Sequence, residues 1–221
     1  MKHKLDREGM AKRAAMELKS GDYVNLGFGM PNLCAAYACK DVIFQTENGA
    51  IGYGPLVPAN EIGKADFHYH DALGRFWVPA PGMALFDVLT SFCMIRGGRM
   101  IAILGGLQVS EKGDLANWSM GGETLVGTIG GGMDLAMGAK KLIITMGHTT
   151  KEGRPRVVKE CTLPLTGKKC VDLIVTDIAL IKVTPKGLLL KEVAPGWTEG
   201  EVQALTEPKL VISPDLKEME L

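Results

Sequence analysis

The 221-residue chain is long enough to bury a substantial core, and its length suits one large α/β domain, so we expect a single domain over residues 1–221. Lys and Arg together number 25, as do Asp and Glu, and this balance argues against nucleic-acid or anionic-membrane partners. No apolar run approaches the roughly 20 residues of a spanning helix. With no signal sequence at its N-terminus, the chain is expected to be soluble and cytoplasmic.

Short apolar strands alternate with helices along the chain. The pattern predicts a helix over 7–19, strands over 23–26 and 42–45, a helix over 83–95, strands over 100–104, 142–146 and 173–183, a helix over 198–205 and a strand over 209–213. Several of these strands are apolar throughout, which is typical of strands covered on both faces. The sequence therefore predicts a three-layer α/β/α architecture with a largely parallel, mixed sheet, whose carboxyl-terminal strand ends carry the ligand-binding loops.

One carboxylate stands on a turn directly after the 42–45 strand, in the stretch QTENGAIGYGP (45–55). Asn-Gly is a strong hairpin signal, so Glu47-Asn48-Gly49 alone is typical of an exposed turn. The competing interpretation makes Glu47 a nucleophile, and it requires groups that stabilise an oxyanion. A nucleophilic carboxylate must also be ionised, so heavy desolvation that raised its pKa would defeat this role, and hydrogen bonds from neighbouring amides are expected to keep it charged and aimed.

Two further segments offer such groups. Gly130-Gly131-Gly132 can point bare backbone N–H groups into a site, although a tight loop before a helix explains the glycines equally simply. Gln108 and Asn117 stand near a predicted strand end, where they either orient a ligand carbonyl or satisfy loop backbone.

Other kinds of site find little support in the sequence. No Ser lies in a G-x-S-x-G elbow, and the five cysteines have neither zinc-ligand spacing nor an electropositive motif around them. His68 and His70 lie near Asp66 and Asp71, but two histidines on a polar loop are usually solvated. We therefore expect no metal site.

Six segments, taken together and in this order, resemble the β subunit of the class I coenzyme A transferases. They are VNLGFGMP (24–31), QTENGAIGYGP (45–55), SFCMIRGGR (91–99), LGGLQVSEKGDLANW (104–118), GGGMDL (130–135) and KECTLPLTGKKCVDLIVTD (159–177). The resemblance implies a CoA-transferase (NagB/RpiA-like) fold and transfer of CoA between an acyl-CoA and a short-chain or 3-oxoacid. It implies no permanently bound cofactor, because coenzyme A and acyl-CoA are substrates.

The resemblance also implies roles for individual residues. Glu47 would attack the acyl-CoA thioester and carry CoA as a glutamyl thioester in a ping-pong reaction. The amides of Gly130 and Gly131 would form the oxyanion hole, with Gln108 and Asn48 as further substrate-binding residues. A separate α subunit is implied as partner, in an αβ or α2β2 assembly.

The chain departs from the family's pattern over FHYHDAL (67–73), where an Asn-Ala-Gly stretch is usual. We expect that the acid exchanged is not plain acetate or succinate, and that Asp71, with His68 or His70, recognises a polar or amine-bearing acyl group there. Two rival functions stay open: an acyl-CoA hydrolase or isomerase that uses Glu47 as a general base, and a non-catalytic ligand-binding subunit.

Overall fold

The computed structural model describes residues 2–72, 74–121 and 129–220. Its helices are α1 (Arg7–Ala15), α2 (Val88–Arg96), α3 (Gly132–Gly138) and α4 (Glu199–Ala204), with 3-10 helices η1 (Met30–Ala36) and η2 (Ala59–Lys64). The strands of the large sheet are β1 (Tyr23–Leu26), β2 (Ile43–Thr46), β3 (Ala50–Ile51), β4 (Ala84–Leu85), β5 (Ile101–Gly105), β8 (Lys141–Thr145), β10 (Leu173–Val175), β11 (Ala179–Thr184), β12 (Gly187–Val193) and β13 (Val211–Glu218). A small sheet contains β6 (Gln108–Ser110), β7 (Leu115–Ala116) and β9 (Val157–Val158).

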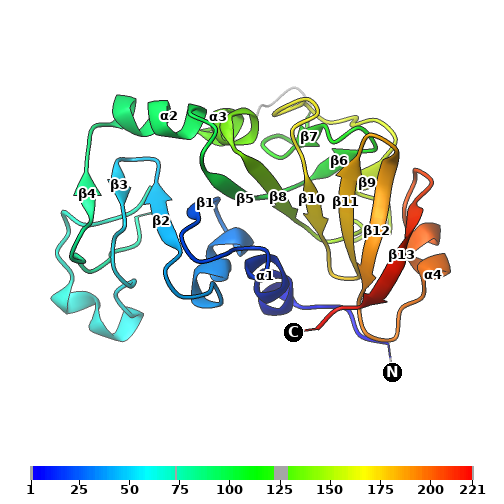
Figure 1. The fold of residues 1–221 in the computed structure, drawn as a ribbon, viewed down its shortest axis with the longest axis horizontal. Coiled ribbons are helices and arrows are strands. Elements are labelled where there is room, and N and C mark those ends of the chain that lie inside the picture. Colours follow the sequence, from blue (N-terminus) through cyan, green and yellow to red (C-terminus); the bar gives the residue numbers. More distant parts are fainter. Residues whose placement is uncertain (1, 73, 122–128, 221) are drawn as a thin grey trace.

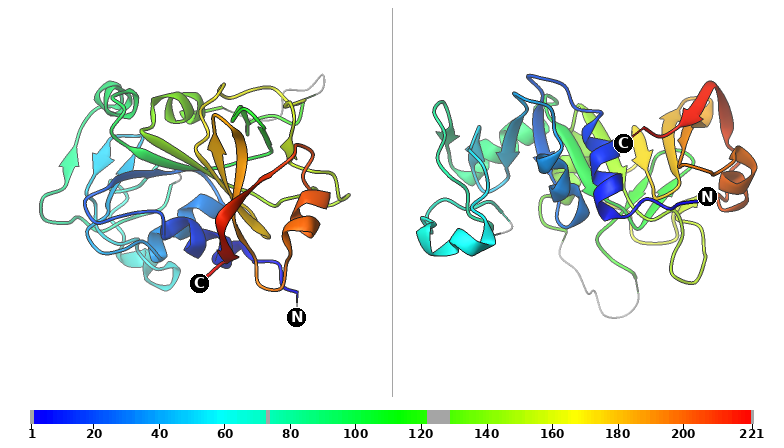
Figure 2. Two further views of the ribbon diagram at one scale, coloured as in Figure 1. Left: turned by 45° about the vertical axis from the view of Figure 1, so that its right-hand side comes forward. Right: turned by 90° about the horizontal axis from the view of Figure 1, so that it is seen from below.

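The large sheet has the strand order β13-β12-β11-β10-β8-β5-β1-β2-β3-β4 (Figure 1). Its five central strands, β2, β1, β5, β8 and β10, are parallel to one another. Antiparallel pairs continue the sheet on both sides. On one side β2 pairs with β3 and β3 with β4; on the other β10 pairs with β11 and β11 with β12. The strands near η2 and those near α4 lie at opposite ends of the molecule (Figure 2). The predicted α/β class with a largely parallel, mixed sheet is confirmed.

Alternate residues of the central strands bury in two different cores. Ile101 and Ile103 of β5 pack with residues of α1 and η1 on one face. Ala102 and Leu104 of the same strand pack with residues of α2 and α3 on the other face. Because both faces are covered, the strand needs apolar residues at every position, as the unbroken apolar runs indicated.

Several element boundaries differ from the predicted ones, and the last strand runs over Val211–Glu218 rather than 209–213. The helix predicted over 83–95 begins at Val88, because the Asp87 side chain caps it by accepting a hydrogen bond from the Thr90 amide at 2.9 Å. The run 173–183 is a hairpin of β10 and β11, because the Thr176 hydroxyl accepts the amides of Ile178 and Ala179. The first helix ends at Ala15 rather than 19. The capping box predicted at Thr198 is present.

His148 is fully buried between two threonines. The Thr206 hydroxyl donates to the Val202 carbonyl at 2.7 Å, so it accepts from Nε2–H of His148, 2.8 Å away. Nδ1 lies 2.9 Å from the Thr176 hydroxyl, which also lies 3.1 Å from the Ala179 carbonyl and has one proton for these two acceptors. Burial lowers the pKa of His148 from 6.5 to about 4, against an opposing effect of Asp177.

This buried histidine makes stability depend on pH. Between its ordinary pKa of 6.5 and its folded value of about 4, the unfolded chain binds a proton that the folded protein refuses. The free energy of unfolding should therefore fall by about 3 kcal/mol as the pH drops through this window. We expect urea denaturation of H148N to show a flatter pH dependence, whereas H68N, at an exposed histidine, keeps the wild-type slope. Equal slopes for H148N and wild type would contradict this assignment.

In the described part of the chain, no helix is both long and apolar enough to cross a membrane.

Candidate active site

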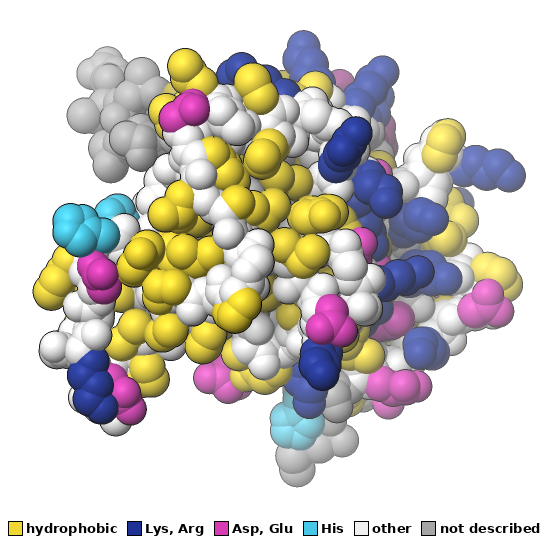
Figure 3. Space-filling view, turned by 60° about the vertical axis from the view of Figure 1, so that its left-hand side comes forward, with side chains coloured by type: hydrophobic (Ala, Val, Ile, Leu, Met, Phe, Trp, Pro, Cys, Tyr) yellow, Lys and Arg dark blue, Asp and Glu magenta, His cyan; other side chains and the backbone are white. Residues whose placement is uncertain are grey.

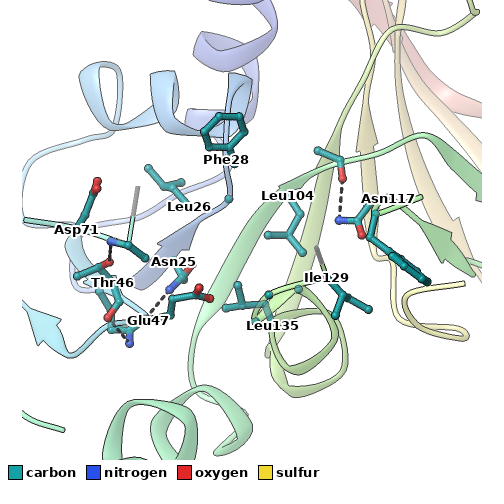
Figure 4. A pocket seen from close by; sticks show the side chains of 18 of the residues that line it. Asn25, Leu26, Phe28, Thr46, Glu47, Asp71, Leu104, Asn117, Ile129 and Leu135 are labelled. Atoms are coloured by element: carbon teal, nitrogen blue, oxygen red, sulfur yellow. Dashed lines mark hydrogen bonds between the residues drawn. The ribbon is translucent and has the colours of Figure 1, made fainter. Parts of the chain in front are cut away.

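A cavity of about 650 Å³ opens where the parallel strands β1, β2 and β5 end (Figure 4). Its walls come from the ends of these strands and from the glycines that begin α3. The lining includes Asn25, Phe28, Thr46, Glu47, Leu104, Asn117, Ile129 and Leu135. The cavity thus lies at the carboxyl edge of the parallel strands, where the alternation of strands and helices predicted a ligand site.

Glu47 occupies the tight turn between β2 and β3. The two strands pair antiparallel, and the Gly49 amide donates to the Thr46 carbonyl at 3.0 Å. Gly49 has φ +118°, and a Cβ there would lie 2.0 Å from the Phe86 carbonyl oxygen, so only glycine fits. The Asn-Gly signal therefore marks a real hairpin, and Glu47 stands on a rigid turn.

Both neighbours of Glu47 tie its turn to the 70–72 segment. The Thr46 hydroxyl donates to Asn48 Oδ1 and accepts the Ala72 amide, each at 2.9 Å. Asn48 Nδ2 in turn donates to the His70 carbonyl oxygen at 2.9 Å. The Asn48 side chain is thus engaged with a neighbouring loop and is not among the residues that line the cavity.

A buried polar network supports the turn from below. Asn25 of β1 donates to the Gln45 side-chain oxygen at 2.5 Å, and Gln45 donates to the Ser91 hydroxyl at 2.7 Å. All three side chains are buried, and Asn25 and Gln45 are register partners on parallel strands. Sequence analysis did not single out this network, although a polar residue inside each short apolar strand was its signal.

The Glu47 carboxylate faces the loop that begins α3 (Figure 4). A Cβ on Gly131 would lie 2.1 Å from Glu47 Oε2, and one on Gly130 would lie 4.0 Å from Oε1. Among the described residues, neither glycine amide donates a hydrogen bond to the chain. The carboxylate thus lies beside two glycines whose amides are unpaired, and unpaired backbone amides are the groups from which an oxyanion site is built.

The electrostatics of Glu47 differ from the expectation that amides hold it charged. No donor in the described part of the chain hydrogen-bonds its carboxylate. Burial, and after it the negative charge of Asp134, raises the pKa of Glu47 above its ordinary value of 4.5. The half-buried carboxylate is thus partly desolvated without a compensating hydrogen bond from the neighbouring glycines.

Other predicted site residues lie outside the cavity lining. Gln108 accepts the amides of Thr162 and Leu163 at 2.9 and 3.1 Å, so it satisfies loop backbone, the simpler of its two interpretations. His68 and His70 are exposed on the loop before Asp71. The structure brings Glu47, Gly130, Gly131 and Asp71 to the cavity and leaves Gln108, Asn48, His68 and His70 outside its lining.

Asp71 lines the cavity as half of an ion pair. Its side chain is 3% exposed and bonds Arg75 Nε at 2.7 Å, Nη2 at 2.6 Å and the Arg75 amide at 2.9 Å. Arg75 and Tyr53 also line the cavity, and sequence analysis missed both. Asn117 lines it too, while its side-chain nitrogen holds the Gly105 carbonyl at 3.1 Å.

Comparison with known proteins places this geometry in a family. The family model described as Coenzyme A transferase matches residues 7–204. A probable coenzyme A transferase beta chain of Bacillus subtilis is 46% identical over 94% of this chain and 95% of its own. The B chain of a 3-oxoadipate CoA-transferase of Acinetobacter baylyi is 42% identical over 95% and 96%. The B chain of a succinyl-CoA:3-ketoacid coenzyme A transferase of Helicobacter pylori is 42% identical over 93% and 99%.

Solved structures share the fold at lower identity. An acyl-CoA transferase of Escherichia coli O157:H7 superposes with a TM-score of 0.73 at 22% identity, over 98% of this chain and 44% of that one. The decarboxylase AibA/AibB superposes with a TM-score of 0.71 at 15% identity, over 97% and 88%. The fold thus hosts more than one reaction, and the sequence relationship decides between them. From the family match and the identities of 42–46% along nearly its whole length, the chain belongs to the coenzyme A transferase family, as a β-type subunit of the class I enzymes.

Proposed function

We propose that this CoA-transferase works by covalent catalysis on Glu47, through a glutamyl-CoA thioester. The observation that carries the proposal is the placement of one unbonded carboxylate beside Gly130 and Gly131, whose amides are unpaired. A carboxylate is a weak nucleophile toward a thioester in water. It therefore needs to be held in a fixed orientation toward the thioester carbonyl, and the oxyanion needs a binding site. The rigid turn supplies the first, and the glycine amides supply the second.

The exchange proceeds in two symmetrical halves. A Glu47 carboxylate oxygen attacks the acyl-CoA carbonyl, and collapse of the tetrahedral intermediate expels CoA thiolate and leaves a mixed anhydride. The thiolate then attacks the Glu47 carbonyl and releases the first acid as its carboxylate. The acceptor carboxylate attacks the glutamyl thioester carbonyl and expels CoA thiolate, which leaves a second mixed anhydride. The thiolate then attacks the acyl carbonyl of this anhydride, which forms the new acyl-CoA and releases the Glu47 carboxylate. Every intermediate stays activated, so little free energy is lost.

Burial raises the pKa of Glu47, contrary to the expectation that amides hold it charged, but the side chain is only half-buried. A carboxylate that is partly withdrawn from water and accepts no hydrogen bond is a stronger base and a stronger nucleophile, provided that it is ionised at the working pH. The glycine amides stabilise the charge where it develops, on the substrate oxygen, rather than the attacking carboxylate. Gly130 and Gly131 thus favour the transition state over the ground state.

The relatives named as B or beta chains support a second, α-type chain as partner. We infer an αβ or α2β2 assembly. Hydrophobic side chains gather over one side of the molecule, as the space-filling view shows (Figure 3). Leu85 of β4 and Val88 and Leu89 of α2 are 57%, 50% and 76% exposed, an arrangement that suits a protein interface.

The acids exchanged belong to the short-chain 3-oxoacid and dicarboxylic classes. Relatives at 42% identity are named for 3-oxoadipate and for succinyl-CoA with a 3-ketoacid. A cavity of about 650 Å³ is large enough for such an acyl group together with the thioester end of CoA.

Hydroxylamine trapping tests the proposed intermediate. The chain, copurified with its partner, is mixed with an acyl-CoA, treated with neutral hydroxylamine and digested for mass spectrometry. A glutamyl-CoA thioester gives a hydroxamate at Glu47 that depends on acyl-CoA. Turnover without any hydroxamate on the Glu47 peptide would favour the rival hydrolase or isomerase, in which Glu47 activates water or removes a proton and forms no adduct.

A further inference from the structure

The cavity that holds Glu47 also holds two hydrogen-bond donors that the proposed chemistry leaves unused. These are the Tyr53 hydroxyl and the guanidinium of Arg75, both in the cavity lining. In the described part of the chain the Tyr53 hydroxyl has no hydrogen-bond partner, and Nη1 of Arg75 has none either. Donors without a partner in the chain, on residues that line a cavity, are available to a ligand that brings an acceptor.

Arg75 is fixed by its neighbours in a way that leaves one side of its guanidinium open. Asp71 takes Nε and Nη2, and Asn32 Oδ1 accepts from Nη2 at 3.1 Å. The Arg75 side chain is 32% exposed. The planar fork is therefore held in one orientation while the two N–H groups of Nη1 remain available, which is the arrangement suited to an anionic oxygen.

Tyr53 is equally fixed. Its ring stacks on the buried Trp77 at 5.2 Å between centroids, while Tyr69 packs against Trp77 at 5.1 Å. Burial, and after it the charge of Asp71, raises the pKa of Tyr53 to about 12, so its phenol keeps its proton as a donor. Tyr53, Asp71 and Arg75 line the same cavity.

We propose that Tyr53 and Arg75 form a subsite for a carboxylate at the far end of the acyl chain, so that the enzyme selects dicarboxylic acyl groups. The proposal rests on the covalent function of Glu47 and names the substrate class of that same site. One oxygen of the distal carboxylate accepts from Nη1 of Arg75 and the other from the Tyr53 hydroxyl. The bound substrate is thereby aimed with its thioester carbonyl toward Glu47.

This subsite replaces the amine-bearing acyl group expected from sequence. Asp71 already carries three contacts from Arg75, so an ammonium group would have to compete with a bonded guanidinium. The exposed His68 and His70 do not line the cavity. The charged side chains of the described lining are Glu47, Asp71 and Arg75, and the unbonded Nη1 of Arg75 is the group among them that can donate to an anionic tail.

A panel of acyl-CoA donors tests the subsite in the copurified enzyme. Succinyl-CoA carries the distal carboxylate, acetoacetyl-CoA has a neutral oxygen and butyryl-CoA has neither. Y53F removes only the hydroxyl, and the double variant D71N/R75Q removes the cation while keeping the buried pair neutral. Loss of a hydrogen bond to a charged group should lower kcat/KM for succinyl-CoA roughly 10- to 100-fold, with less than about a threefold change for butyryl-CoA and acetoacetyl-CoA.

Y69F is the matched control, because Tyr69 contacts the same tryptophan without lining the cavity. It should leave the preference among the three donors unchanged. An equal loss for all donors in Y53F and D71N/R75Q, or a loss for acetoacetyl-CoA as large as for succinyl-CoA, would overturn the subsite. The hydroxamate at Glu47 reports separately on the covalent function: if it forms while donor preference is unmoved, only the subsite fails.

Discussion

Replacing Glu47 by glutamine should abolish CoA transfer and at the same time raise the melting temperature at neutral pH. Removal of a covalent nucleophile is expected to lower kcat at least about 10³-fold. The stability gain follows from the raised pKa, because folding confines a carboxylate where its charge is disfavoured. Glutamine keeps nearly the same shape and has no charge, so it removes that penalty. Activity at this site is thus obtained at the expense of stability.

The pH dependence of the gain identifies its cause. A group whose pKa is raised by folding destabilises the protein once the pH exceeds that pKa, and has no such effect below its ordinary value of 4.5. The melting temperature of E47Q should therefore exceed that of the wild type at neutral pH and converge with it toward pH 4.5. E61Q, at the exposed Glu61 in η2, is the control and should change neither activity nor stability. An E47Q enzyme that transfers CoA at the wild-type rate would refute covalent catalysis at this residue.

Replacing Gly131 by alanine is expected to have the next largest effect. The backbone there has φ −80°, which alanine adopts without strain, so the whole effect comes from the added methyl group. Its carbon would lie 2.1 Å from Glu47 Oε2 and 3.2 Å from Phe92 Cζ. The carboxylate must then leave its position against the glycine amides, and we expect kcat to fall about 10²- to 10³-fold.

A double-mutant cycle on stability separates this clash from a general loss of folding. G131A should lower the free energy of unfolding of the wild type. In an E47A background, where the clashing carboxylate is gone, it should lower that free energy much less. G200A is the matched control, because a methyl group on Gly200 in α4 meets no atom within 4 Å. It should leave activity intact. Equal costs of G131A in both backgrounds would show that the methyl group does not act through Glu47.

Much of the fold followed from local sequence signals. The apolar runs of β5 and β8 predicted strands covered on both faces, and the burial of alternate residues in two cores bears this out. The Thr198 capping box is present because a cap is a contact between residues three apart. Where prediction missed, one local contact outweighed the pattern. Asp87 delays the start of α2, and Thr176 turns a single apolar run into a hairpin.

Some features of the candidate site also followed from local sequence signals, and others did not. The sequence by itself determined that Glu47 stands on a turn at a strand end, because the Asn-Gly pair and the left-handed conformation of Gly49 are properties of adjacent residues. It also supplied the glycines of 130–132 as bare backbone. Only the tertiary structure decided that Gly131 meets Glu47, that Gln108 turns to the 162–163 loop, and that Tyr53 and Arg75 share the cavity. Such meetings depend on how distant segments pack, which neither periodicity nor turn chemistry encodes.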